Sequence, residues 1–242
     1  MALTVDLNAD MGESFGVYTL GDDDAMLDIV TTANVACGFH AGDPLVMHRT
    51  VERAKARGVA IGAHPGFLDL WGFGRRRIEG DPPEDVARMV VYQIGALQAI
   101  AAAAGHRVTH VKPHGALANR AVVDDTLAEA IAQSIRRVDP GLIFMVMPGM
   151  ATERAGEKAG LRLVREVYAD RTYDDDGSLT ARKEPGAVIH DTGLAAARVL
   201  RMLEEQAITT ISGAKLPARI DTICVHGDNP AAVAMARALR RS

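Results

Sequence analysis

The segment VDLNADMGES at residues 5–14 places polar side chains on alternate positions, Asp6, Asn8 and Asp10. Successive side chains of a β-strand point to opposite faces, so these three would share one face. Burying a carboxylate is costly unless it is paired, and a face with two carboxylates therefore looks onto partners or a polar cavity. We expect Asp10, at the mouth of the strand, to do chemistry. Asp6 lies deeper and either pairs with a lysine or histidine or contacts substrate.

Other ionisable residues end or closely follow further strand-like segments. They are His40 after VTTANVAC, His64 in VAIGAH, Lys112 and His114 in VTHVKPH, Asp170 in LRLVREVYAD, and His226 with Asp228 in DTICVHGD. Glu166 and Tyr168 share the parity of Asp170. Barrel interiors are usually filled by apolar side chains, so several strands that send ionisable groups inward indicate a catalytic or water-filled cavity.

A metal site is one interpretation of these residues. His110 and His114 have the i, i+4 spacing of helical zinc ligands, but the intervening proline disfavours a helix. On a strand the two side chains would lie about 13 Å apart and could not share an ion. Ligands from different strands, such as Asp10, His40 and His64, would leave an open position for water. The sequence permits a divalent metal and does not require one.

The elements that must position these residues alternate along the chain. Seven runs rich in β-branched and apolar residues, separated by helical patterns, are LTVDLNAD, VTTANVAC, VAIGAH, VTHVKPH, LIFMVMPG, LRLVREVYAD and DTICVHGD. Such alternation indicates parallel strands, in a closed barrel or an open doubly wound sheet. Because polar residues end nearly every strand, we predict the barrel. The fold class is α/β, a distorted (β/α)7-type TIM-like barrel, with residues 1–242 as one domain.

Capping residues predict where the helices begin. Helix starts are expected at Asp43–Pro44, Asp81–Pro82, Asp124 or Asp125, and Asn229–Pro230. Gly58 and Gly105 mark expected helix ends. The polar segment from Glu166 to His190 is longer than an ordinary strand-to-helix loop and is therefore a candidate lid or binding loop.

Composition narrows the class of function. The chain of 242 residues has 27 basic and 31 acidic residues, and its net charge of -4 is too weak to indicate a nucleic-acid or membrane partner. No apolar run of membrane-spanning length and no signal peptide are apparent, and two cysteines, Cys37 and Cys224, fit a reducing compartment. We predict a cytoplasmic protein. The basic run Arg75–Arg77 is expected to be a solvated loop or an anion contact.

Six ordered motifs carry a resemblance to a known family. VDLNADMGESFG, TTANVACGFHAGDP, IGAHPGFLDLWGFGRR, KPHGAL, EVYADRTY and VHGD resemble the LamB/YcsF family from residue 5 to beyond residue 228. The resemblance implies a distorted barrel related to those of glycoside hydrolases and deacetylases. It also implies action with the B and C subunits of 5-oxoprolinase, which convert 5-oxoproline to glutamate at the expense of ATP.

The residues suit that chemistry. The chain has no G-x-x-x-x-G-K-[ST] loop, so we expect the partner subunits to bind ATP and activate the lactam, while this barrel adds water. Water addition needs a base and groups that stabilise an oxyanion. The predicted catalytic residues are Asp10, His40, His64, Lys112 and His114. The predicted substrate-binding residues are Asn8, Glu13, Asn34, Asp170, His226 and Asp228.

Two other functions remain open at this level. The same cavity could serve a stand-alone, metal-dependent amide or acetyl hydrolase of the polysaccharide-deacetylase type. Alternatively, the chain could be a non-catalytic subunit that binds a small acid. Neither the divalent metal nor a homo-oligomeric state is decided by the sequence.

Overall fold

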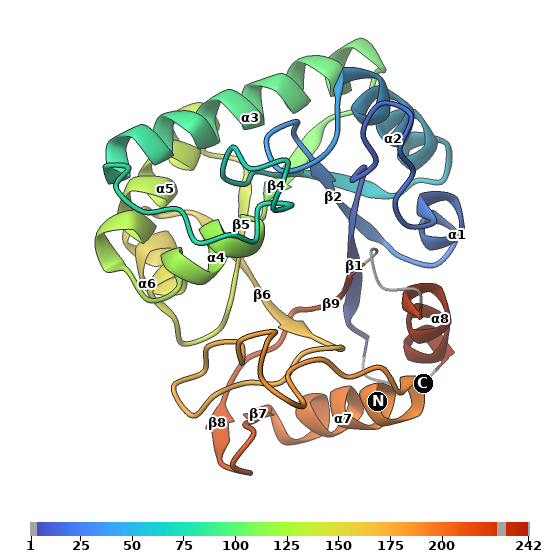
Figure 1. The fold of residues 1–242 in the computed structure, drawn as a ribbon, viewed down its shortest axis with the longest axis vertical. Coiled ribbons are helices and arrows are strands. Elements are labelled where there is room, and N and C mark those ends of the chain that lie inside the picture. The colour runs from blue at the N-terminus through green and yellow to red at the C-terminus, as the bar shows by residue number, and fades with distance from the viewer. Residues whose placement is uncertain (1–3, 227–230, 242) are drawn as a thin grey trace.

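Seven parallel strands close into a barrel in the computed structural model, which describes residues 4–226 and 231–241. The strands are β1 (Asp6–Met11), β2 (Thr32–Ala36), β3 (Ala60–His64), β4 (Val108–Val111), β5 (Ile143–Val146), β6 (Arg162–Tyr168) and β9 (Thr222–His226). They follow one another around the ring, and β9 pairs with both β6 and β1 (Figure 1). Each predicted run supplies one barrel strand, and the predicted fold class is confirmed.

Helices surround the barrel (Figure 1). They are α1 (Asp23–Leu27), α2 (Pro44–Ala56), α3 (Pro83–Ala103), α4 (Gly115–Ala121), α5 (Asp125–Val138), α6 (Ala151–Lys158), α7 (Thr192–Glu205) and α8 (Ala232–Arg241). The predicted caps are confirmed for α2 and α5, where the side chains of Asp43 and Asp124 accept backbone N–H groups. Gly58 takes a positive φ of 69° just after α2, as expected of a helix end.

The predicted start of α3 is wrong in its capping residue. Pro82, not Asp81, occupies the N-cap position, and no side chain caps this helix. The sequence motif resembled a capping box, but a proline at N1 and an acidic first turn are enough to begin the helix here. The start predicted at Asn229–Pro230 lies outside the described residues.

The expectation that no apolar segment reaches membrane-spanning length is wrong for α3. Its 21 residues are long and apolar enough by length and composition. However, its buried residues recur at helical spacing, with Val86, Val90, Ile94 and Leu97 facing the core. This stripe is typical of a helix packed on a barrel, and burial in the core explains the composition of α3.

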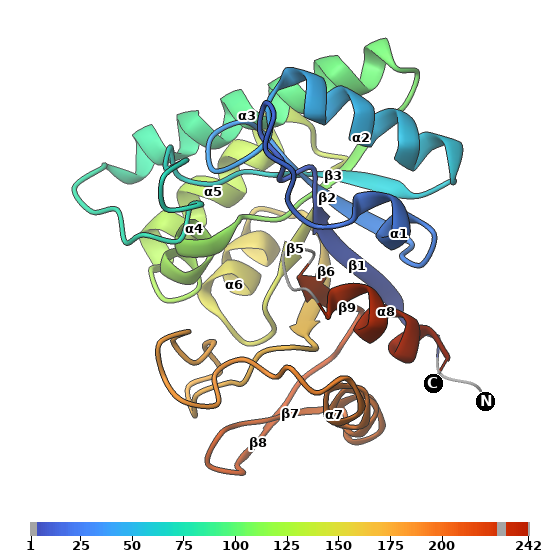
Figure 2. The same cartoon turned by 45° about the vertical axis from the view of Figure 1, so that its right-hand side comes forward.

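The chain between β6 and β9 departs from a simple barrel. After the long loop comes α7, followed by an antiparallel hairpin of β7 (Ala207–Thr209) and β8 (Lys215–Pro217). The sequence pattern did not predict this hairpin. Figure 2 shows the hairpin beside α7, outside the barrel. Thr210 and Ser212 in the hairpin turn donate hydrogen bonds to Asp175, so the hairpin anchors the loop.

Candidate active site

A pocket of about 300 Å³ opens where the strands of the barrel end. The polar side chains that line it include Asp10, His64, Arg75, Lys112, His114, Tyr168, Arg171, Arg182 and His226. Asp10 is paired with Asn34 on β2 and His226 on β9 in the strand register, so residues far apart in sequence reach the same level of the barrel. Ligand sites of β/α barrels lie at this carboxyl end.

Lys112 is the central cation of the pocket floor. Its Nζ lies 2.8 Å from Asp10 Oδ1 and 2.8 Å from Glu166 Oε1, and its side chain is only 3% exposed. Cys224 Sγ lies 3.0 Å from the same nitrogen. Burial alone would lower the pKa of Lys112, but the neighbouring acidic groups outweigh it and raise the pKa well above its ordinary value. Lys112 therefore acts as a fixed positive charge rather than a base.

The two carboxylate oxygens of Asp10 have different surroundings. Oδ1 accepts hydrogen bonds from Lys112 Nζ at 2.8 Å and from Asn34 Nδ2 at 2.9 Å. Oδ2 lies 3.3 Å from His64 Nε2. Burial would raise the pKa of Asp10, but its interactions with His64 and with the Lys112 ammonium prevail and hold the pKa well below the ordinary value. Asp10 is thus an ionised carboxylate whose Oδ2 has the greater freedom to accept a proton.

Two imidazoles meet beside Asp10. His114 Nδ1 lies 3.0 Å from His64 Nε2, and the ring planes are 87° apart. The opposite ring nitrogens face backbone carbonyl oxygens: His64 Nδ1 lies 2.7 Å from that of Lys112, and His114 Nε2 lies 2.8 Å from that of Phe73. Burial and the neighbouring histidines lower the pKa of His114 well below its ordinary value.

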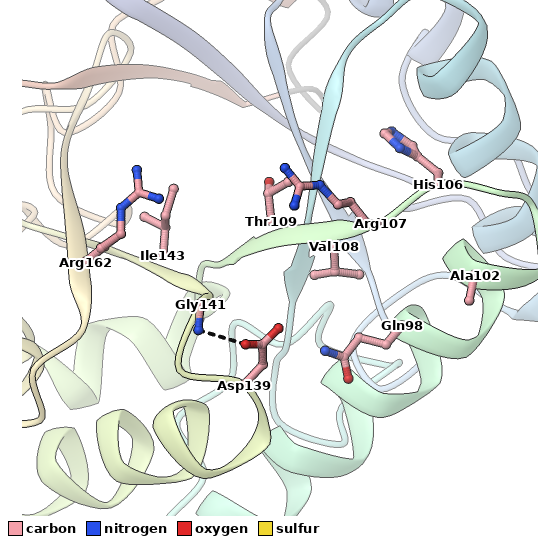
Figure 3. Close-up of a pocket in the computed structure, with 10 residues that line it drawn as sticks. All are labelled: Gln98, Ala102, His106, Arg107, Val108, Thr109, Asp139, Gly141, Ile143 and Arg162. Atoms are coloured by element: carbon pink, nitrogen blue, oxygen red, sulfur yellow. Dashed lines mark hydrogen bonds between the residues drawn. The ribbon is translucent and has the colours of Figure 1, made fainter.

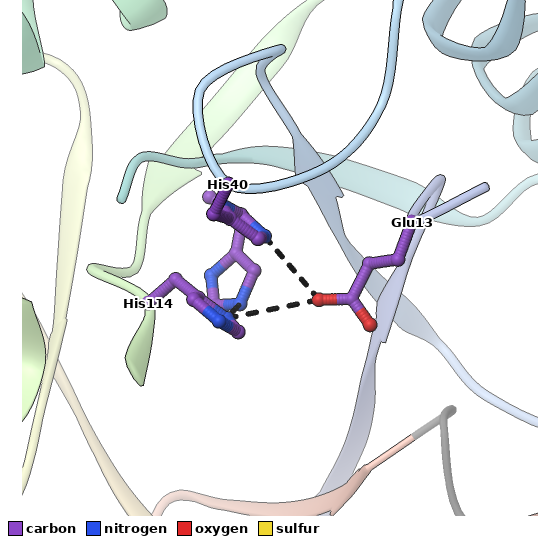
Figure 4. Close-up of side chains that lie close together, drawn as sticks. Glu13, His40 and His114 are labelled. Carbon is purple, nitrogen blue, oxygen red and sulfur yellow. Dashed lines mark hydrogen bonds and ion pairs between the residues drawn. The ribbon is translucent and has the colours of Figure 1, made fainter. Parts of the chain in front are cut away.

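Glu13 and His40 extend this cluster (Figure 4). Glu13 Oε1 lies 3.3 Å from His40 Nε2 and 3.7 Å from His114 Nδ1. The rings of His40 and His114 are stacked, with centroids 3.7 Å apart. One ligand atom from each of Glu13, His40, His64 and His114 lies within 4.8 Å of the others, so these buried groups could hold a metal ion.

The opposite wall of the pocket is built by β6 and β9. His226 Nδ1 lies 2.8 Å from Asp170 Oδ1, and the His226 ring stacks on Tyr168. Burial would raise the pKa of Asp170, but His226 outweighs it and the pKa is lowered. Arg171, Leu179 and residues up to Arg182 from the long loop complete this wall. The loop therefore contributes directly to the pocket, while its role as a lid or binding loop stays a prediction.

Below the pocket, polar residues bind one another. Asn34 Nδ2 donates to Asn8 Oδ1 at 2.8 Å, and Asn8 Nδ2 donates to Thr222 Oγ1 at 2.9 Å. Both asparagines are fully buried and neither lines the pocket. Asp6 accepts hydrogen bonds from the hydroxyls of Thr32 and Thr222. Its partners are thus threonines, whereas a lysine, a histidine or substrate was expected.

The five residues predicted to be catalytic all lie in this region, and all five are buried. Of the predicted binding residues, Glu13, Asp170 and His226 join the cluster or the opposite wall, whereas Asp228 lies outside the described residues. The site prediction omitted Glu166 and Tyr168. Their alternation with Asp170 in the sequence was the signal that could have identified them.

Arginines form a further part of the pocket. Arg75 belongs to the basic run that the sequence indicated as a solvated loop or an anion contact, and Arg171 and Arg182 belong to the candidate lid or binding loop. Arg75, Arg171 and Arg182 line the pocket from two loops, and Arg75 lies over the Phe73 ring. In the basic run, Arg76 pairs with Asp69 and Arg77 with Glu79. Only Arg75 of the three is among the pocket residues. These cations favour an acidic ligand.

A larger cavity of about 480 Å³ lies at the other end of the barrel (Figure 3). It is lined by the first residues of β4, β5 and β6, including Val108, Ile143 and Arg162. Figure 3 shows Arg107 and Arg162 spread apart, and Asp139 is engaged by the backbone N–H of Gly141. Chemistry-bearing groups do not converge among these lining residues, and β/α barrels carry their reactions at the opposite end.

The chain is similar to known proteins along its whole length. The model of the LamB/YcsF family matches residues 5–242. The A subunit of 5-oxoprolinase from Rhodopseudomonas palustris is 56% identical over 239 residues, which cover 99% of this chain and 94% of that protein. The protein of the same name from Gluconobacter oxydans is also 56% identical, over the same shares.

Solved structures agree with this relationship. The lactam utilization protein from Thermus thermophilus is 47% identical, with a TM-score of 0.91 over 99% of this chain and 95% of that chain. A putative cellobiose-phosphate cleavage protein from Enterococcus faecalis has a TM-score of 0.59 at 14% identity over 97% and 89% of the two chains, which shows a shared fold alone. The family match and the close relatives together show that the chain belongs to the LamB/YcsF family.

Proposed function

We propose that this chain is the A subunit of an ATP-dependent 5-oxoprolinase and carries out the hydrolytic opening of the 5-oxo-L-proline ring. The observation that carries the proposal is the convergence of Asp10, Lys112 and His114 at the floor of a pocket lined by arginines. Close relatives named as the A subunit of 5-oxoprolinase and as a lactam utilization protein support the same substrate class.

The proposed reaction divides between subunits. A lactam carbonyl is a poor electrophile, so the B and C subunits would bind ATP and use it to activate the lactam by phosphorylation. The barrel described here then directs water onto the activated carbonyl carbon. The ring C–N bond breaks and the leaving nitrogen is protonated to an amino group, while the carbon that received the water oxygen is left as an acyl phosphate. A second water hydrolyses this acyl phosphate, which releases glutamate and phosphate, and ADP is the other product of the activation step. Such a complex would work in the cytoplasm, where ATP is available.

The residues of the pocket take distinct parts in this step. Asp10 Oδ2 accepts the proton of the attacking water, since Oδ1 is already occupied by Lys112 and Asn34. Lys112 stabilises the negative charge that develops as water adds to the activated carbonyl carbon. A carboxylate with a low pKa is a weak base, and prior activation of the lactam compensates for it. Arg171 and His226 lie where they can hold the acidic end of the substrate.

The decisive experiment measures glutamate formed from 5-oxoproline by the chain with candidate B and C subunits, with and without ATP. We expect turnover only with all components, and loss of turnover in Asp10→Asn with the complex still assembled. His226→Asn, which keeps a donor toward Asp170, should raise KM more than it lowers kcat. His48→Gln, on the surface of α2, is the matched control and should behave as the wild type.

Two outcomes would replace the proposal. Turnover of amide or acetyl substrates by the isolated chain without ATP would indicate a stand-alone hydrolase. Binding of 5-oxoproline combined with full turnover in Asp10→Asn would indicate a protein that only binds the acid. Both alternatives are open from the sequence, and these measurements separate them from the proposed role.

A further inference from the structure

The hydrogen bonds of two histidines fix which of their nitrogens carry protons. A backbone carbonyl oxygen only accepts, so His64 Nδ1 and His114 Nε2, which face such oxygens, must donate. In a neutral imidazole the other nitrogen then bears a lone pair. Those two nitrogens, His64 Nε2 and His114 Nδ1, lie 3.0 Å apart. Two lone pairs therefore point into the same small space.

Carboxylate oxygens flank this pair on both sides. Asp10 Oδ2 lies 3.3 Å from His64 Nε2, and Glu13 Oε1 lies 3.7 Å from His114 Nδ1. All four side chains are 5% exposed or less. Electron-rich atoms at such distances repel one another, and the repulsion is stronger in a buried site than in water. A cation among them would convert the repulsion into attraction.

We propose that Glu13, His64 and His114 bind a divalent cation of the zinc type, with one coordination position open toward the pocket. Metal bonds of about 2.0–2.1 Å in a tetrahedral site separate neighbouring ligand atoms by about 3.3 Å. The separations of 3.0 and 3.7 Å from His114 Nδ1 to His64 Nε2 and Glu13 Oε1 bracket that value. Imidazole donors suit zinc and its neighbours, whereas magnesium and calcium take oxygen ligands.

The surroundings of the ligands are those of a prepared site. Metal-bound histidines commonly donate their second N–H to a backbone carbonyl, which fixes the tautomer and the ring orientation. His64 and His114 both do so, through Lys112 and Phe73. Both rings also line the pocket, so an ion held by them would be reached by substrate or water.

His40 is a positioning residue in this arrangement rather than a ligand. Its ring is stacked on that of His114 with planes only 3° apart. Imidazole lone pairs lie in the ring plane, so the lone pairs of stacked rings run side by side and do not converge on one ion. The N–H of His40 Nε2, 3.3 Å from Glu13 Oε1, instead orients the carboxylate. This assignment replaces the set of Asp10, His40 and His64 that the sequence suggested.

Binding of zinc to the full chain tests the inference without reference to turnover. The chain is treated with a chelator, desalted and titrated with zinc chloride by calorimetry, and bound metal is measured by elemental mass spectrometry. We expect about one zinc per chain, and binding of magnesium weaker by at least about 100-fold. Glu13→Gln and His114→Gln should each weaken zinc binding by more than about 10-fold.

The controls separate loss of a ligand from loss of the fold. His48→Gln removes an imidazole from the exposed face of α2 and should bind zinc as the wild type does. Circular dichroism verifies that each variant is folded; Glu13→Gln, which keeps the side-chain shape, tests the ligand if His114→Gln fails to fold. Absence of zinc binding, or equal binding in Glu13→Gln and the wild type, would refute the site. So would nitrogen NMR that finds a doubly protonated imidazole in the zinc-treated chain, since a shared proton would then occupy the space.

Discussion

Lys112 is the residue on which the buried charges of the site depend. It lies within 2.8 Å of two carboxylates, those of Asp10 and Glu166, and all three side chains are nearly inaccessible. A buried ion pair contributes little compared with apolar residues, but removal of one partner leaves an uncompensated charge. The lysine is therefore required by the fold as well as by the proposed chemistry.

The variant Lys112→Met should consequently destabilise the protein strongly. Breaking a buried pair costs about 3–5 kcal/mol, and here two carboxylates lose their partner. Urea denaturation of the wild type and the variant measures the difference in free energy of unfolding. The double variant Lys112→Met with Glu166→Gln should recover part of the loss because one carboxylate is gone. A loss below about 1 kcal/mol for the single variant would contradict this account.

His110 makes stability depend on pH. Burial lowers the pKa of His110 to about 4, against 6.5 for an ordinary histidine. Between these two values the unfolded chain binds a proton that the folded chain does not, so the free energy of unfolding falls as the pH drops. The contribution of His110 to the free energy of unfolding is about 3 kcal/mol, and it is fully present above pH 6.5 and lost toward pH 4.

His110→Gln isolates this share from that of the other groups. Glutamine can still donate to Asn34 Oδ1, as His110 Nε2 does at 2.8 Å, but does not titrate. Denaturation curves from pH 7 to pH 4.5 should show a smaller loss of stability in the variant than in the wild type. Parallel pH profiles for the two proteins would show that His110 is not responsible.

At the scale of elements, glycine in β3 sets how closely two strands can approach. A Cβ atom on Gly62 would lie 2.1 Å from the His110 ring, whereas one on Gly95 in α3 would have no atom within 4 Å. The first side chain would overpack the barrel interior, and the second would only restrict the unfolded chain. The same substitution should therefore change the free energy of unfolding in opposite directions at the two positions.

Alanine variants at both glycines test this contrast. Gly62→Ala should lower the free energy of unfolding by about 1–3 kcal/mol or more, because the buried imidazole has little room to move. Gly95→Ala should raise it by about 0.5–1 kcal/mol, since alanine is the better helix former. Thermal unfolding of the two variants beside the wild type is sufficient. Destabilisation of similar size at both sites would mean that strand spacing is not the cause.

The strands were predictable because the alternation of polar and apolar side chains along each strand is a local pattern. Several contacts between residues distant in sequence were not predictable. Asp10 and Lys112 point inward by parity alone, but their 2.8 Å ion pair joins β1 to the end of β4 across 102 residues of sequence. The β7–β8 hairpin was missed because its strands have three residues each, too short for a periodic signal. The arginines of the pocket lie on loops, where sequence does not determine the direction of a side chain.

At the scale of the whole molecule, closure of the barrel joins the first strand in the sequence, β1, to the last barrel strand, β9. β9 lies between β6 and β1, so the last strand of the chain completes the hydrogen bonds of the first. It also carries Cys224 and His226 into the site. Alternation of strands and helices predicted the barrel, but only the strand pairing shows which strands meet at the seam.

This closure predicts that the molecule unfolds as one cooperative unit. Far-UV circular dichroism, which reports the helices, and near-UV signals from buried Tyr168 and Tyr173 should give the same midpoint. The calorimetric and van't Hoff enthalpies should also agree. Val225→Ala, which truncates a buried side chain of β9, should cost about 2 kcal/mol and shift both signals together, although α3 lies far from this strand in sequence. Two separate transitions, or a shift confined to one signal, would instead divide the chain into independent domains.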